Sequence, residues 1–359
     1  RVESVKLDER RFTIILADQL ALLDKALPRA LYARSAANAA LAHTPSHIVL
    51  GQPLYCEGAL RSTSALGNDA FAYDLSDGPV RCETVYDKGD SFDALPADWA
   101  TTQDGIGFKL TFAPDEPVVA NPVGGWKFAA SDAIDGSNGG DFTGWAGSPA
   151  VPTGWTQLGA AWNVTNRVQD WSGDVRLRAA GSQMVQMYNS GTSIAAGYHR
   201  ITLDIKSITT AGVVCFLLGG ASTFVRIDRV GPLTVIVKNG SASSAQLQFI
   251  GGHDGTNTLG AIDVVFDTMR GRPATLIEHL TEWTEYLAET LGGADVNTTD
   301  TDALEALADY RLAHYAEPAE TILSILRKTL DGWCGWLVPK LDGTLTVGRM
   351  DVPAATASL

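Results

Sequence analysis

The sequence has few of the residues on which covalent chemistry commonly depends. Its 359 residues include four cysteines, Cys56, Cys82, Cys215 and Cys334, and none of them forms a CxxC pair. This spacing favours buried free thiols over a disulfide framework or a thiolate metal site. The chain also lacks any run of about eighteen apolar residues, so it predicts no membrane-spanning helix.

Recognisable catalytic motifs are missing as well. The chain has no GxSxG, no P-loop and no GxGxxG after a predicted strand. His43 and His47 have the spacing of two metal ligands on one helix face. However, Pro45 lies between them, and no Glu follows His43 as a zinc-protease motif requires. We therefore predict no enzyme and no catalytic residue.

Positive charge is scarce relative to negative charge. The chain carries 27 Lys and Arg against 41 Asp and Glu, which gives a formal net charge of −14. Such a chain repels a phosphate backbone, so we expect no nucleic-acid partner.

Glutamate is absent from residues 117 to 277, and this gap suggests how the chain is divided. Residues 123–271 have no net charge, whereas residues 1–122 and 272–359 are both acidic. A composition that changes and then changes back favours an inserted domain, and Pro and Gly lie at both junctions. We predict an insert at 123–271 within one discontinuous unit made of 1–122 and 272–359.

The predicted insert has the pattern of strands. Ile201, Leu203 and Ile205 alternate with polar residues, and the run GVVCFLLGG suits a strand that is covered on both faces. Further short apolar runs are separated by Gly, Asn and Ser turns, and no helical period occurs. The pattern predicts an antiparallel β-sandwich of the jelly-roll type.

The outer segments favour a mixed α+β unit, which makes the whole chain mainly β with some α. Apolar spacing predicts helices from Pro273 to residue 291, from Asp302, and from Pro318 to residue 331. Alternation predicts a strand over residues 11–16 and two hairpins, over residues 71–84 and 336–347.

Tryptophans gather in the first part of the insert. An indole face can stack on a sugar ring, although most of these rings could equally be core. Trp155 is expected to be buried, and Trp171, in a polar stretch, is the best exposed candidate. We name Trp171, Trp145, Trp162 and Tyr188 as candidate glycan-binding residues, with Asp174, Arg176 and Asn189 as possible hydrogen-bonding partners.

Three short phrases of the insert resemble carbohydrate-binding-module jelly rolls. They are NGGDFTGW at 138–145, PTGWT at 152–156 and GAIDVVF at 260–266, and the resemblance spans residues 126–269. Such modules often hold a structural calcium ion, and the matching acids are Asp141 and Asp263. The resemblance therefore implies a structural Ca²⁺. The family has two acids where only Asp263 stands, so two surface aspartates are the other interpretation.

The outer segments resemble tail-tip or baseplate hub proteins of long-tailed bacteriophages. The phrases are HIVLGQP at 47–53, SDGPVRCETVYDKG at 76–89, and ILRKTLDGWCGW at 325–336 followed by DGTLTVGR at 342–349. The resemblance implies a structural protein of the virion, located at the phage tail tip. Its partners would be sister copies in a ring, other tail proteins and host-surface glycan. It also implies that the chain is a middle portion of a longer protein.

Three functions remain open at this point. The first is a tail-tip hub whose insert binds host-surface glycan. The second is a non-catalytic carbohydrate-binding region of a secreted carbohydrate-active enzyme. The third is a purely structural insert without a ligand.

Overall fold

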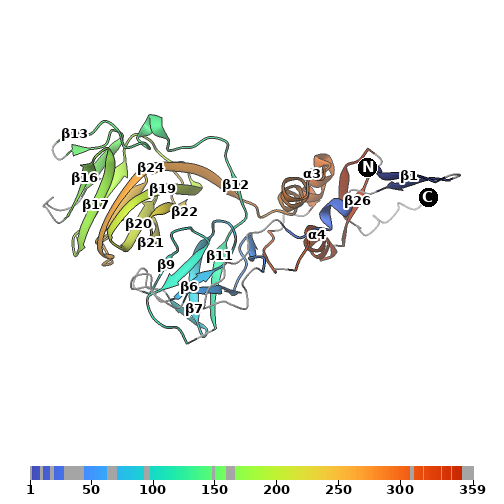
Figure 1. Ribbon diagram of the computed structural model, residues 1–359, viewed down its shortest axis with the longest axis horizontal. Helices are drawn as coiled ribbons and strands as arrows, with labels where there is room; N and C mark the ends of the chain where they lie inside the picture. Colours follow the sequence, from blue (N-terminus) through green and yellow to red (C-terminus); the bar gives the residue numbers. More distant parts are fainter. Residues whose placement is uncertain are drawn as a thin grey trace, which may run out of the picture. The chain divides into compact units, whose positions relative to one another are not determined.

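The computed structural model describes most of the chain (Figure 1). The described residues are 2–8, 11–16, 20–27, 44–62, 71–92, 98–115, 117–147, 150–158, 166–307, 311–317, 319–332, 334–340 and 342–349. The chain forms two compact units, one made of residues 1–30 and 277–359 and the other of residues 31–276.

These units differ from the predicted segments. Residues 31–122, expected to join residues 272–359, belong to the same unit as the predicted insert. The junction expected at 271/272 lies five residues before the end of that unit. The units differ from the predicted segments because strand pairing continues across both expected junctions. Charge composition carries no information about strand pairing.

The larger unit contains a β-sandwich, as the alternating pattern predicted. One face is a six-stranded sheet in the order β16-β17-β24-β19-β22, with β12 also paired to β24 (Figure 1). Its strands are β12 (Trp126–Phe128), β16 (Arg167–Trp171), β17 (Asp174–Gly181), β19 (Gly197–Thr210), β22 (Gly231–Asn239) and β24 (Gly260–Leu276).

The opposing face belongs to a nine-stranded sheet in the order β15-β18-β23-β20-β21-β9-β10-β6-β5. Its strands are β5 (Ala59–Ser62), β6 (Phe71–Asp74), β9 (Trp99–Thr101), β10 (Gly107–Leu110), β15 (Trp155–Leu158), β18 (Val185–Asn189), β20 (Gly212–Leu218), β21 (Ala221–Ile227) and β23 (Gln248–Gly251).

Alternate residues of both sheets fill the space between them. On β19 the predicted inward residues Ile201, Leu203 and Ile205 are all buried. The ring of Phe249 lies 5.0 Å from that of Phe216 and 5.1 Å from that of Phe266, which joins the two sheets through aromatic contacts. Pairs at these separations add to the stabilisation that burial alone provides.

The sandwich is continuous with residues that precede the predicted insert. β9 pairs in parallel with β21 at Thr101 and Val225, so the sheet extends into residues 59–110. Gln103 is buried, its side-chain amide donates to the Arg229 carbonyl at 2.8 Å, and its side-chain oxygen accepts from the amides of Asp228 and Arg229. The β21 edge of the predicted insert is therefore completed by β9, a strand that precedes the insert in the chain.

Charged groups strengthen the same junction. Arg61 binds Asp74 at 2.6 Å and Asp104 at 2.8 Å, and Asp104 in turn binds Arg229 at 2.7 Å. Burial opposes the charged form of Asp104, but Arg61 outweighs burial and holds the pKa of this carboxyl below its usual value.

The hairpin predicted over residues 71–84 does not form. β6 belongs to the nine-stranded sheet, whereas β7 (Arg81–Asp87) pairs with β11 (Val118–Val123) and β8 (Asp90–Phe92) in another sheet that also holds β4 (Cys56–Glu57). The segment around Asp77 and Gly78 thus carries the chain from one sheet to the next. A tight hairpin occurs instead between β7 and β8, where Lys88 and Gly89 both have positive φ.

Short elements complete the larger unit. They are β3 (Ile48–Leu50), η1 (Gly136–Asn138), β13 (Ala146–Gly147) and β14 (Ala150–Val151). Cys56, Cys82 and Cys215 are buried and form no disulfide, as predicted, and burial raises the pKa of the Cys215 thiol to about 12. Cys334, in the smaller unit, is exposed, contrary to the expectation for all four thiols.

The smaller unit combines helices with hairpins. Its elements are β1 (Val2–Asp8), β2 (Arg11–Leu16), α1 (Leu20–Leu23), α2 (Leu280–Glu285), η2 (Tyr286–Gly292), α3 (Thr298–Leu307), β25 (His314–Ala316), α4 (Ile322–Asp331), β26 (Gly335–Pro339) and β27 (Leu345–Arg349). The predicted strand at residues 11–16 and the hairpin of β26 and β27 are confirmed.

Helix α4 shows both the success and the limit of the helical pattern. Its predicted stripe is buried, Thr321 caps its first turn and Gly332 follows its last residue. The helix predicted from Pro273 begins instead at Leu280, because residues up to Leu276 remain paired in β24. No helix in the described part of the chain is long and apolar enough to span a membrane.

Candidate functional site

Trp171 lies at the tip of the hairpin formed by β16 and β17. Ser172 and Gly173 make the two-residue turn with φ of 60° and 97°, and the Gly173 amide donates to Asp170 Oδ1 at 2.9 Å. Positive φ at both positions matches the twist of the flanking strands. The turn leaves 46% of Trp171 exposed, as the polar sequence around it predicted.

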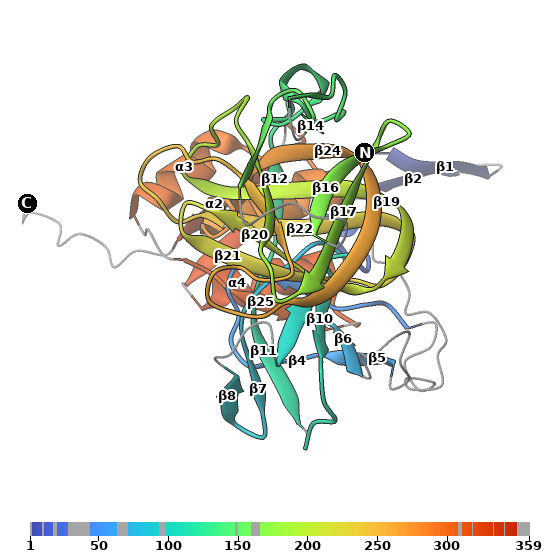
Figure 2. The same ribbon diagram turned by 90° about the vertical axis from the view of Figure 1, so that its left-hand side faces the viewer.

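The two strands separate apolar and polar side chains between their faces. Val168, Val175 and Leu177 point into the sandwich core. Arg167, Gln169 and Trp171 of β16, Asp174, Arg176 and Arg178 of β17, and Asp263 of β24 alternate with core residues and form the outer face, which we call the hairpin face. Figure 2 shows β16, β17 and β24 in the second view of the sheet.

A buried acid fixes the orientation of Trp171 through an arginine. Asp263 is 5% exposed and binds Arg176 through two bonds of 2.7 Å, Nε to Oδ1 and Nη2 to Oδ2. The Arg176 guanidinium carbon lies 4.4 Å from the centroid of the Trp171 ring. The bonds to Asp263 raise the pKa of Arg176. Because Arg176 is held by Asp263, its contact with the ring restricts the orientation of the exposed indole.

The end of the sheet beside Trp171 is acidic. Asp204 pairs with Asp267 across β19 and β24, and Lys206 binds Asp204 at 2.6 Å and Asp267 at 3.8 Å. Burial, followed by the charges of Asp267 and Asp204, raises the pKa of Asp174. Its ionised form therefore opposes folding.

Replacement of Asp174 by asparagine is expected to raise the free energy of unfolding at pH 7 by about 0.5 kcal/mol. A raised native pKa means that the wild type loses stability as the pH rises from the unfolded pKa through the native one. The gain of the variant should therefore vanish below the unfolded pKa. Urea unfolding at pH 7 and pH 3 measures this, and a gain that is equal at both pH values would contradict it.

The other predicted aromatic residues do not join Trp171 on the hairpin face. Tyr188 is half-buried on β18 of the nine-stranded sheet, where it pairs with Thr156 and Gln248. Trp145 is half-buried against the sandwich core. Trp162 lies outside the described residues. The expected burial of Trp155 is confirmed. Its indole N–H donates to the Gly139 carbonyl at 2.9 Å.

The polar residues named with Trp171 divide into two groups. Asp174 and Arg176 lie on the hairpin face. Asn189 is buried, its amide donates to the Asn138 carbonyl at 3.1 Å, and its oxygen accepts from the Thr192 amide. Asn189 therefore holds loops together and is not presented to a ligand.

The two predicted calcium ligands do not meet. Asp141 pairs with Arg270, and Asp263 pairs with Arg176 and Arg178. Arg270 follows Asp263 by seven residues on β24, roughly 20 Å of extended strand. Among the described residues, no group of three or more His, Cys, Asp or Glu is placed to hold a metal ion. The two acids are better explained as arginine partners.

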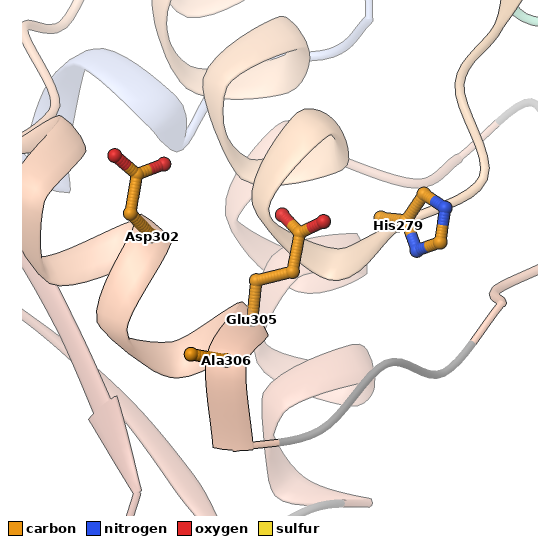
Figure 3. A pocket seen from close by; sticks show the side chains of 4 residues that line it. All are labelled: His279, Asp302, Glu305 and Ala306. Atoms are coloured by element: carbon orange, nitrogen blue, oxygen red, sulfur yellow. The ribbon is translucent and has the colours of Figure 1, made fainter.

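A polar depression in the smaller unit is the other candidate. Figure 3 shows Asp302 and Glu305 on α3 with His279, which precedes α2, and Ala306 completes the lining. The Thr281 hydroxyl donates to Glu305, which ties this carboxylate to α2. Its three titratable side chains do not form a metal-binding group. The hairpin face, with its exposed and oriented indole, is the stronger candidate.

Comparison with known proteins gives distant matches to solved structures. No protein-family model matches the chain, and no curated protein matches it. Solved structures that match include a mutant of the carbohydrate-binding module CBM29-2, made to probe ligand recognition by family 29 modules. It is 12% identical, and the match covers 41% of this chain and 91% of that one with a TM-score of 0.24.

Two further structures give similar values. Another CBM29-2 mutant, complexed with mannohexaose, is 10% identical over 41% of this chain and 91% of that one with a TM-score of 0.22. A family 29 carbohydrate-binding module is 11% identical over 34% and 80% with a TM-score of 0.21. Superpositions this loose decide neither the fold nor the ligand of this chain.

Proposed function

We propose that the larger unit is a non-catalytic carbohydrate-binding unit and that the hairpin face is its binding surface. The single observation that carries the proposal is the chain of contacts from buried Asp263 through Arg176 to the exposed indole of Trp171. An indole at the surface normally moves between rotamers, and ordering it on binding costs free energy. Here Arg176 lowers that cost in advance, as a stacking platform for a sugar ring requires.

The neighbouring side chains supply the polar half of such a surface. Gln169 lies two residues before Trp171 on the same side of β16, and Arg178 lies two residues after Arg176 on β17. Binding sites of this kind combine an apolar platform with a few placed hydrogen-bonding groups. The sequence resemblance to carbohydrate-binding modules over residues 126–269 agrees with this function.

Replacement of Trp171 by alanine is expected to lower the affinity for a bound glycan at least tenfold and to leave the thermal unfolding temperature nearly unchanged. The reason is that the stacking platform is lost, while an exposed side chain contributes little to folding. A glycan array followed by titration calorimetry measures the effect. Trp145→Phe, which changes a ring packed against the core, is the matched control and should keep its affinity.

If the wild-type chain binds no glycan on a broad array, the proposed function is wrong. If glycan binds but Trp171→Ala has no effect, the function stands and the site is wrong. A structural insert without a ligand would be the better description only if the wild type binds no glycan.

A second proposal concerns the setting in which this unit works. The ordered phrases at 47–53, 76–89 and 325–349 favour a structural protein of a phage tail tip, with sister copies and other tail proteins as partners. The mass of the full chain in solution, measured by light scattering, tests this together with labelling of intact particles. A chain that stays monomeric and is absent from the particles would favour the secreted, non-catalytic alternative.

A further inference from the structure

Two arginines stand side by side at the far end of the hairpin face. Arg167 of β16 is directly opposite Arg178 of β17 in the antiparallel register. Both alternate with core residues on their strands, so both side chains lie on the outer side of the six-stranded sheet. Like charges in directly opposed positions destabilise a sheet unless an anion lies between them.

The carboxylate available nearby is already shared. Asp263 lies opposite Arg178 on β24 and binds its Nε at 3.5 Å, while both of its oxygens bind Arg176 at 2.7 Å. Two guanidinium groups, those of Arg176 and Arg178, therefore share one buried carboxylate, and Arg167 adds a third positive charge opposite Arg178. This part of the face carries an excess of positive charge, although the protein as a whole is strongly acidic.

The main chain of Arg167 is paired with Arg178, but its side chain forms no ion pair with any residue in the described ranges. Its Nε is shielded from water and unpartnered there, and so is Oε1 of Gln169, the next outward residue on β16. A shielded donor and a shielded acceptor without partners are costly, so such groups commonly have a ligand or water as their partner. Both groups lie on the strand that presents Trp171.

We infer that the hairpin face selects an anionic glycan, with a sugar carboxylate or sulfate bound by Arg167 and Arg178 while Trp171 stacks on another ring of the same chain. The inference rests on the proposed function and adds the class of ligand. A guanidinium is planar and binds carboxylate or sulfate oxygens through two parallel bonds, which a neutral hydroxyl cannot match.

The spacing and the charges give the bound chain a direction. Trp171 and Arg167 are four residues apart on β16, roughly 13 Å along the strand, which a short oligosaccharide can span. β16 ends the sheet order, so the ligand lies along a sheet edge. The acidic groups Asp174, Asp204 and Asp267 lie near the indole and repel an anion there. The charged substituent therefore belongs at the Arg167 end.

The test compares matched oligosaccharides on the full chain by titration calorimetry. The ligands are an oligogalacturonate, its fully methyl-esterified form, and a sulfated oligosaccharide of neutral sugars. The wild type should bind one of the two anionic ligands at least tenfold more tightly than the neutral ester, with an affinity that falls as salt is added. Which of the two binds more tightly distinguishes a carboxylate from a sulfate ester.

Variants then separate the two contacts. Arg167→Gln should remove most of the preference for the anionic ligand and leave the weaker neutral binding in place, whereas Trp171→Ala should weaken both. Lys206→Gln is the control, because it removes an exposed positive charge from the acidic end of the same sheet and should not lower anion affinity. Unfolding curves confirm that each variant is folded.

The outcomes distinguish this inference from the proposed function. Equal binding of the ester and the anion, unaffected by Arg167→Gln, would overturn the anionic preference and leave carbohydrate binding intact. Anion binding that Lys206→Gln weakens as much as Arg167→Gln would show a general charge effect and also overturn it. If none of the three ligands binds, the anionic preference is also overturned. If no glycan on a broad array binds, the proposed function is wrong as well.

Discussion

Replacement of Asp263 by asparagine is expected to lower the free energy of unfolding by about 3 kcal/mol. The carboxylate is buried and is the acid that holds Arg176 and Arg178, so its loss leaves two guanidinium groups without their counter-charge. Glycan affinity should fall as well, because Arg176 would no longer hold the indole of Trp171. Urea unfolding and titration calorimetry measure the two effects.

Asp267→Asn is the matched control for this substitution. Asp267 lies four residues further along β24, its nearest cation, Lys206, is 3.8 Å away, and it faces Asp204 in the register. Removing its charge should change stability by less than about 0.5 kcal/mol. If both variants unfold alike, the arginine pairing of Asp263 does not stabilise the sandwich. A double variant, Asp263→Leu with Arg176→Met, should regain stability without regaining affinity, since no buried charge is left unpaired.

Removal of residues 31–122 is expected to destabilise the sandwich by on the order of 5 kcal/mol. Without these residues β21 loses β9, and Val213 and Phe224, which lie in one buried cluster with Ala100, lose that cover and become accessible to water. The hydrogen bonds of Gln103 to the segment between β21 and β22 are lost as well. An exposed edge strand beside an apolar patch also promotes aggregation.

The experiment compares two fragments, residues 31–276 and residues 123–276, by expression, light scattering and urea unfolding. The longer fragment should be monodisperse and unfold cooperatively. The shorter one should aggregate or unfold at much lower urea. A shorter fragment as stable as the longer one would restore the original prediction of a self-contained insert. Gln103→Leu in the longer fragment should give a smaller loss, because the strand pairing remains.

Much of the secondary structure followed from local patterns in the sequence. The alternation in β19, the apolar run of β20 and the stripe of α4 all led to elements at the expected places. Burial of Trp155 and exposure of Trp171 also followed from their neighbours. These features depend on residues close together in the chain, and a one-sided apolar pattern has few ways to be buried.

Partnerships between distant residues were not predictable in the same way. The hairpin over residues 71–84 was predicted from two alternating stretches around Asp77 and Gly78, yet each stretch pairs with a different sheet. The helix predicted from Pro273 was displaced because pairing with β12 and β19 kept that segment extended. In both cases strand partners far along the chain outweighed local preference.

The sequence by itself determined that this protein is mainly β, contains a sandwich and presents Trp171 to solvent. Only the tertiary structure decided that Asp263 forms an ion pair with Arg176, that Arg167 lies opposite Arg178, and that residues before 123 complete the sandwich sheet. The physical reason is that the burial pattern of a strand depends on the strand's own residues, whereas register and sheet order depend on which strands pair. A charge gains its partner only when those strands are in place.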